Sequence, residues 1–283
     1  MIRNYSYKPS PVFHAARNEH TNANTRFFGT EVEMDYRSGV RLNISSHELS
    51  DKFDEIHPDF IYCKHDGSLS DNGLELVTHP GTLNYHMKEC HWKHMTTQAS
   101  KNGFRSHDSS TSCGFHVHVN RDSLGATDEE RAETIRKMTY LIIKHAAPIL
   151  EFSRRNARAM EQWAPIPSIP RGGVSAIPTY TPNHNDRYTA LNVNNTNTVE
   201  FRIFRGTLRR DTIIASIQFC NNWCDYAMTH SWEECQNSTF DDIMNTHEYN
   251  ELTQYLINRG LRSPDVPTLP NRRTCNFNRE GTR

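Results

Sequence analysis

The sequence predicts an α+β protein in which an antiparallel β-sheet is covered on one face by helices. Several segments alternate apolar and ionisable residues with a period of two, which is typical of strands with one buried face. Amphipathic helical segments lie between and after them, and they can cover the apolar face of the sheet. No linker divides the chain, so we expect one domain over residues 26–260, between a flexible N-terminal arm (1–25) and a Pro/Arg-rich tail (261–283).

The expected strands follow one another from residue 26 to residue 208. Residues 26–37 alternate and form the first strand, and residues 62–80 form a hairpin with turns at Asp66-Gly67 and Asn72-Gly73. A third strand covers 113–122, "CGFHVHVNRD". Two short strands occupy 187–208 and are joined by an Asn/Thr-rich turn at 194–198.

The expected helices separate and follow these strands. A short helix lies near 46–53, a longer one runs over 82–101, and a capping box of Thr127 and Glu130 opens a helix that reaches residue 152. Asp211 caps another, whose apolar stripe includes Cys220 and Cys224, and a last helix covers 239–259. The Pro-rich segment 163–182, which contains Arg171, is expected as an irregular loop that could close over a site as a lid.

Composition excludes some classes of function. The net charge of −1 gives no general attraction to nucleic acids or membranes, so the only nucleic-acid component we expect as a ligand is a nucleotide. The seven cysteines form no CxxC pair, which favours free thiols in a reducing compartment. The first 20 residues lack the apolar region of a signal peptide, and no apolar run is long enough to span a membrane. We therefore expect a cytoplasmic protein.

Ionisable residues gather on the polar faces of the expected strands. The pairs are Glu31 with Glu33, His116 with His118, and Glu200 with Arg202, and Glu75 follows the second hairpin turn. Carboxylates held close together repel each other unless cations neutralise them, and carboxylate clusters suit Mg²⁺ or Mn²⁺. Arginines beside such a cluster indicate an anionic ligand, best a phosphate; the candidates are Arg202, Arg187 and Arg205.

The motifs "FGTEVEMD", "DGSL…GLELV", "CGFHVHV", "RYTALNV" and "TVEFRIFRGTL" occur in the order seen in the amidoligase family, and the resemblance covers about residues 28–208. These enzymes resemble the carboxylate–amine ligases that share the glutamine synthetase and γ-glutamylcysteine synthetase catalytic fold. The resemblance implies a curved antiparallel sheet, with helices on its convex face and ATP and Mg²⁺ on its concave face. It also implies that ATP phosphorylates a carboxylate and that an amine then displaces phosphate.

The resemblance assigns roles to individual residues of this sequence. It implies metal ligands at Glu31, Glu33, Glu75, His116 and Glu200. It implies that His116 also approaches the nucleotide phosphates, that Arg202 contacts the γ-phosphate, and that Arg187 and Asn192 bind substrate or phosphate. His118 and Arg205 are further candidates for nucleotide binding, although Arg205 has the opposite strand parity and reaches the site only if its strand bends.

Two other classes of function stay open. The HxH strand with a glutamate could hold Zn²⁺ for hydrolysis, which would need neither ATP nor Arg202. The chain could also be a non-catalytic protein on the same fold. For the ligase, the acid and the amine could be small molecules or peptides, and a homo-oligomer is possible.

Overall fold

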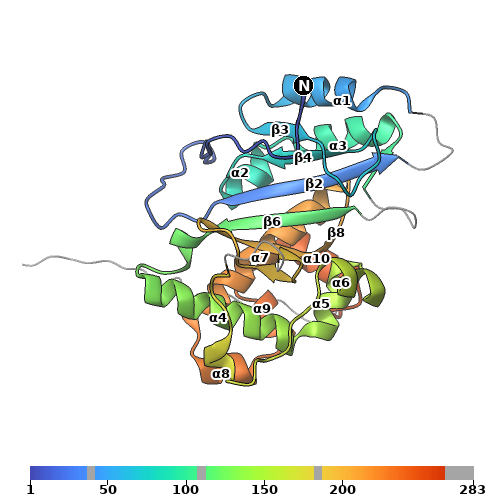
Figure 1. The fold of residues 1–283 in the computed structure, drawn as a ribbon. Helices are drawn as coiled ribbons and strands as arrows, with labels where there is room; N and C mark the ends of the chain where they lie inside the picture. Colours follow the sequence, from blue (N-terminus) through green and yellow to red (C-terminus); the bar gives the residue numbers. More distant parts are fainter. Residues whose placement is uncertain (37–41, 107–112, 182–186, 265–283) are drawn as a thin grey trace, which may run out of the picture.

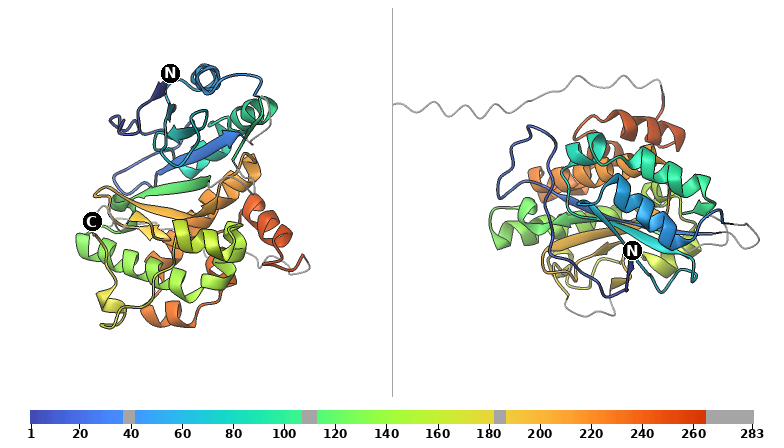
Figure 2. Two further views of the ribbon diagram at one scale, coloured as in Figure 1. Left: turned by 45° about the vertical axis from the view of Figure 1, so that its right-hand side comes forward. Right: turned by 90° about the horizontal axis from the view of Figure 1, so that it is seen from above.

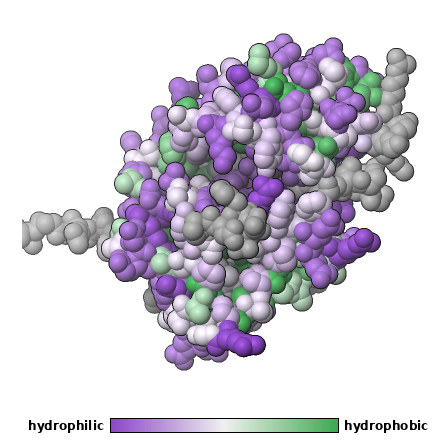
Figure 3. Space-filling model, in the orientation of Figure 1, coloured by the Kyte–Doolittle hydropathy of each residue, from purple (hydrophilic) through white to green (hydrophobic). Residues whose placement is uncertain are grey.

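The computed structural model describes residues 1–36, 42–106, 113–181 and 187–264, and it is an α+β structure built on an open sheet (Figure 1). The predicted tail therefore lies outside the described residues from position 265 onward. The surface in Figure 3 is mostly hydrophilic with scattered apolar residues, since most large apolar side chains lie in the core. No helix in the described part of the chain is long and apolar enough to cross a bilayer.

The sheet is mixed but mainly antiparallel, which confirms the predicted fold class. In spatial order its strands are β1 (Ile2–Arg3), β3 (Ile61–Lys64), β4 (Leu74–Thr78), β2 (Phe28–Tyr36), β6 (Gly114–Asn120), β8 (Thr198–Arg205) and β7 (Leu191–Asn192). The short β5 (Phe104–Arg105) pairs with the end of β2. The one parallel pair in the described sheet joins β1 to β3, so part of the expected N-terminal arm contributes an edge strand.

The helices lie between and after the strands. Their bounds are α1 (Ser46–Ile56), α2 (Leu83–Lys88), α3 (Trp92–Lys101), α4 (Asp128–Lys144), α5 (Ala146–Ser153), α6 (Ala157–Trp163), α7 (Arg210–Thr229), α8 (Trp232–Asn237), α9 (Phe240–Met244) and α10 (Asn250–Asn258). Two 3₁₀ turns, η1 (Arg121–Leu124) and η2 (Val174–Ala176), complete the described elements.

The predicted capping box at Thr127 and Glu130 is confirmed at the start of α4, but three predicted helices are wrong in length. The expected helix over 82–101 is two helices, because His91 adopts a left-handed backbone conformation with φ 54° between them. The helix expected up to residue 152 is interrupted at His145, and the one over 239–259 is interrupted between Met244 and Asn250. Apolar periodicity continues across such breaks, so the sequence pattern alone does not reveal them.

One face of the sheet packs on helices and forms the core. Val32, Phe115, Val117 and Phe201 on the central strands are at most 1% exposed. Helices α2, α7 and α10 lie together on one side of the sheet (Figure 2), joined through Gln218 of α7, which bonds both Met87 and Glu251. Cys220 and Cys224 of α7 are buried free thiols, which confirms the prediction that they belong to the core.

Candidate active site

The strand register brings the predicted ionisable residues together on the other face of the sheet. In the β2–β6 pair Glu31 lies opposite His116, and in the β2–β4 pair Glu33 lies opposite Glu75. Glu200 of β8 lies between two partners, since its register neighbours are His118 of β6 and Asn192 of β7. Residues directly opposite in an antiparallel pair share a face. Residues as far apart in the sequence as Glu31 and Glu200 therefore form one cluster. The alternation of apolar and polar residues within each strand could not show this.

Glu31 and the two histidines form the centre of this cluster. The Nδ1 atom of His116 lies 3.1 Å from Oε2 of Glu31 and 3.5 Å from Oε1 of Glu200. The Nε2 atom of His118 lies 3.3 Å from Oε1 of Glu31. One carboxylate therefore contacts both imidazoles of the HxH strand.

The donor atoms are close enough to hold metal ions. Within the described residues, three groups place one ligand atom from each member within 4.8 Å of one another. They are Glu31–Glu75–His116, Glu31–His118–Glu200 and Glu33–Asp66–Glu75. We call them triads A, B and C in that order. Each triad offers carboxylate oxygens and at most one imidazole. Such ligands suit Mg²⁺ or Mn²⁺ better than Zn²⁺, because zinc sites usually contain more nitrogen or sulfur ligands.

Burial and neighbours divide the carboxylates into two groups. Burial raises the pKa of Glu75 well above its ordinary value, and repulsion from Glu31 adds to the effect, although Lys64 opposes it. Burial likewise raises the pKa of Glu33, against the opposing influence of His116. For Glu31, the attraction of His118, His116 and Lys64 outweighs burial and holds its pKa well below the usual range. The pKa values of Glu33 and Glu75 are thus raised and that of Glu31 is lowered, although the three carboxyl groups share one face of the sheet.

Glu200 is held on both sides by neighbouring polar groups. Arg202 Nη1 donates to its Oε1 at 2.5 Å, and Asn192 Nδ2 donates to its Oε2 at 2.8 Å. Burial raises the pKa of Glu200, but His118 and Arg202 outweigh it, so the pKa is lowered. The carboxylate is thus kept charged and fixed in orientation, as a ligand for a cation requires.

A bulge in the β6–β8 pair changes the position of Arg205. Val117 pairs with Phe201 and Phe115 pairs with Phe204, so β8 carries one extra residue opposite His116. Beyond the bulge Arg205 lies opposite Gly114, which has the parity of His116, so the bulge moves Arg205 to the face of His116, and its role in nucleotide binding stays a prediction. The Nε atoms of Arg202 and Arg205 are both buried without a hydrogen-bond partner in the described part of the protein. Arg202 also contacts Glu200 of triad B, and a buried guanidinium donor without a partner at that place fits an anionic ligand.

Arg187 lies farther out, at the rim of the polar face. Its guanidinium donates to the hydroxyls of Tyr5 at 2.6 Å and of Tyr188 at 2.7 Å. The Tyr188 ring also lies under Arg202, with the guanidinium carbon 5.6 Å from the ring centre. Tyr188 therefore connects Arg187 to Arg202. Among the described residues, no hydrogen bond or ion pair joins Arg187 to a member of the metal triads.

Sequence reasoning missed two buried cations of the site. Lys64 on β3 lies 2.9 Å from Glu75, and the alternation of Ile61 and Cys63 with Lys64 was a signal that could have identified it. Arg155 follows α5, and its guanidinium bonds the backbone oxygen of Ile203. Burial lowers the pKa of Arg155 to about 10, although Glu33 opposes the shift. No periodicity indicated Arg155, because it follows a residue in left-handed conformation outside the regular elements.

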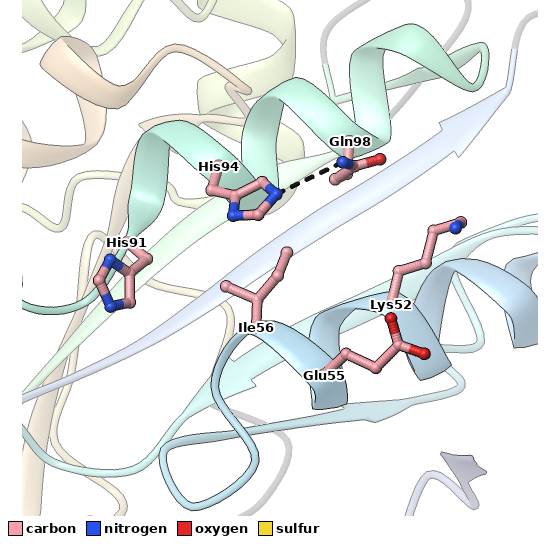
Figure 4. A pocket seen from close by; sticks show the side chains of 6 residues that line it. All are labelled: Lys52, Glu55, Ile56, His91, His94 and Gln98. Carbon is pink, nitrogen blue, oxygen red and sulfur yellow. Dashed lines mark hydrogen bonds between the residues drawn. The ribbon is translucent and has the colours of Figure 1, made fainter.

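Two other predicted or visible features lie outside this cluster. Of the segment expected as a lid, residue 182 lies outside the described residues, Trp163 ends α6, and 164–181 are irregular apart from η2. The backbone N–H of Ala190 donates to the backbone oxygen of Pro165, and closure of the segment stays a prediction. A separate cavity of about 420 Å³ lies between α1 and α3 (Figure 4). It is lined by Lys52, Glu55, Ile56, His91, His94 and Gln98. None of the predicted site residues lines it.

The open sheet thus presents three candidate metal-ligand triads, together with Arg202 and Arg205, on one face. A family model described as "Putative amidoligase enzyme" matches residues 13–224, and the chain belongs to this family of amide-bond-forming ligases. The match confirms the resemblance drawn from the motifs. No curated protein matches the chain.

One solved structure with a similar arrangement is the complex between the prokaryotic ubiquitin-like protein Pup and its ligase PafA. The similarity covers 73% of this chain and 47% of that chain, with 12% sequence identity and a TM-score of 0.38. The matched part thus spans about half the length of that chain.

Proposed function

We propose that the protein is an ATP-dependent carboxylate–amine ligase that uses Mg²⁺ or Mn²⁺ and forms its amide bond through an acyl phosphate. The observation that supports this most is the convergence of triads A, B and C with the unpaired Nε atoms of Arg202 and Arg205 on one sheet face. Carboxylates would attract the cations and arginines would attract the phosphates, which together fit a metal-bound triphosphate.

Each predicted residue has a role in this proposal. The metal ions would be held by Glu31, Glu33, Glu75, His116 and Glu200, with Asp66 as an added ligand from triad C. When bound, the ions would neutralise the phosphate charge and lower the barrier to phosphoryl transfer. Arg202, Arg205 and His118 would bind the nucleotide phosphates, while Asn192 fixes Glu200.

The chemistry requires two displacements. An oxygen of the substrate carboxylate attacks the γ-phosphorus of ATP, the bond to the β-phosphate oxygen breaks, and ADP leaves. The amine nitrogen then attacks the acyl carbon, phosphate leaves with the bonding electrons, and the nitrogen loses a proton. Arg202 would offset charge on the transferring group, a contribution typically worth about 10²–10³ in rate. Arg187 at the rim would bind the carboxylate of the acid substrate.

The partners and location follow from the same chemistry. The substrates would be small-molecule or peptide acids and amines, and the protein would work in the cytoplasm, where ATP is available. The six described cysteines are buried and form no disulfide bond with one another, which fits a reducing compartment.

The zinc-hydrolase alternative is less well supported by the geometry. Each triad found among the described residues contains at most one of His116 and His118, so no triad unites both imidazoles of the HxH strand. A hydrolase of this kind would also leave Arg202 and Arg205 without a purpose.

The proposal is tested by measuring ADP release from ATP and Mg²⁺ with a mixed panel of acids and amines. We expect ADP only when both an acid and an amine are present, and we expect Glu200→Gln to lower turnover by about 10³-fold with the fold intact. The matched control is Glu248→Gln, the same change at an exposed residue between α9 and α10. Full activity of Glu200→Gln would refute the metal assignment. A folded protein that binds neither ATP nor Mg²⁺ by calorimetry would favour a non-catalytic role, and ATP-independent hydrolysis would favour the zinc enzyme.

A further inference from the structure

We propose that Lys64 is a built-in cation of the active site, which takes the place of a divalent ion in triad A. The enzyme would then hold two divalent ions, in triads B and C, although the face offers three ligand groups. The inference rests on the metal dependence of the proposed function and adds the number of ions to it.

The position of Lys64 supports this role. Lys64 on β3 lies opposite Glu75 on β4 in the antiparallel register, so the two side chains share the polar face. Its Nζ atom lies 2.9 Å from Oε2 of Glu75 and 4.0 Å from Oε1 of Glu31. These carboxylates are two of the three ligands of triad A. The Lys64 side chain is only 13% exposed, so solvent screens its charge weakly.

The other two triads are less affected by this ammonium group. Lys64 forms ion pairs with Glu31 and Glu75. Triad B therefore keeps two ligands that do not pair with Lys64, His118 and Glu200, and triad C likewise keeps Glu33 and Asp66. In triad A only His116 is not paired with Lys64. A divalent ion in triad A would have to bind carboxylates that already face the ammonium group, and the two positive charges would repel each other.

The type of residue also fits the role. A lysine ammonium is a compact point charge, whereas the planar guanidinium of Arg202 is suited to a directional contact such as the one it makes with Glu200. Lys64 therefore supplies permanent positive charge between Glu31 and Glu75, where a bound ion would supply it only at sufficient metal concentration.

The experiment counts bound ions rather than activity alone. Mn²⁺ is titrated into the full-length protein with a non-hydrolysable ATP analogue, and free Mn²⁺ is followed by electron paramagnetic resonance. We expect two ions per wild-type chain and three per Lys64→Met chain, since methionine is unbranched, only one heavy atom shorter than lysine, and uncharged. Lys64→Arg keeps the charge and should bind two. The control Lys52→Met makes the same change at the separate α1–α3 cavity and should also bind two.

The outcomes separate this inference from the proposed function. Three ions in the wild type, or two in Lys64→Met, would overturn the role of Lys64 while leaving a metal-dependent ligase intact. No Mn²⁺ binding by the folded wild type would instead refute the metal dependence itself. If Lys64→Met does not fold, as judged by circular dichroism, Lys64→Gln provides the uncharged variant, with the same expected count of three.

Discussion

The two faces of the central sheet are made by the same strands, but different interactions stabilise them. On β8, Phe201 and Ile203 are fully buried against helices, whereas Glu200 and Arg202 lie on the opposite face and pair with each other. The core face is stabilised by removal of apolar area from water, and the polar face depends on the balance of charges. The difference teaches that burial alone does not mark the core, since Glu200 is only 3% exposed.

Two buried histidines show the contrast most directly. His86 of α2 bonds the backbone oxygen of Phe28 at 2.8 Å on the core side, and burial lowers its pKa to about 4. His118 on the polar face is also buried, but Glu200 and Glu31 outweigh burial and raise its pKa. The pKa of the same kind of side chain is thus lowered on one face and raised on the other, because the polar face supplies carboxylates beside His118.

The largest loss of stability is expected from a substitution on the core face of the sheet, and it tests whether this face differs from the polar face. Phe201→Ala should lower the free energy of unfolding by about 3–5 kcal/mol, because it removes a fully buried aromatic ring and leaves a cavity. Urea denaturation measures the change. The control Phe13→Ala removes a ring that is 56% exposed and should have a much smaller effect. Equal losses in the two variants would contradict the assignment of this face as the core.

On the polar face, the next largest effect is expected in activity rather than stability. Arg202→Lys should lower kcat/KM for the ligase reaction by about 10²-fold. The guanidinium of Arg202 donates to Glu200 through Nη1 and leaves its Nε donor without a partner, and the single ammonium group of lysine cannot reproduce both features. Wild-type kcat/KM in this variant would show that only the charge of Arg202 is needed.

The smallest expected effect concerns the pH dependence of stability. His86 has a lowered pKa of about 4 in the folded protein, so its contribution is present above the unfolded value of about 6.5 and is lost as pH falls toward 4. Between pH 7.5 and pH 5 this single group should cost about 2 kcal/mol of stability.

His86→Gln, which keeps an N–H donor for Phe28, should remove that part of the pH dependence. Denaturation curves of wild type and variant at both pH values measure it. Parallel pH profiles for the two proteins would show that His86 is not held neutral by burial.

Much of the site was predictable because strands alternate with a period of two. Alternation placed Glu31 with Glu33 and His116 with His118 on polar faces, and the ordered motifs indicated the family that the model match confirms. Alternation could not place Arg205, because the bulge opposite His116 inserts one residue and reverses its parity. It also could not find Arg155, whose guanidinium reaches the site from a segment after α5.

The sequence by itself determined the class of fold and the identity of the polar residues, because side-chain alternation is a local property of each strand. Only the tertiary structure decided which of these residues meet. The pairing of β3 with β4 brings Lys64 beside Glu75, and the order β4–β2–β6–β8 brings Glu75, Glu31, His116 and Glu200 into one cluster. Strand order depends on packing and hydrogen bonding between distant segments, and no local pattern in the chain records it.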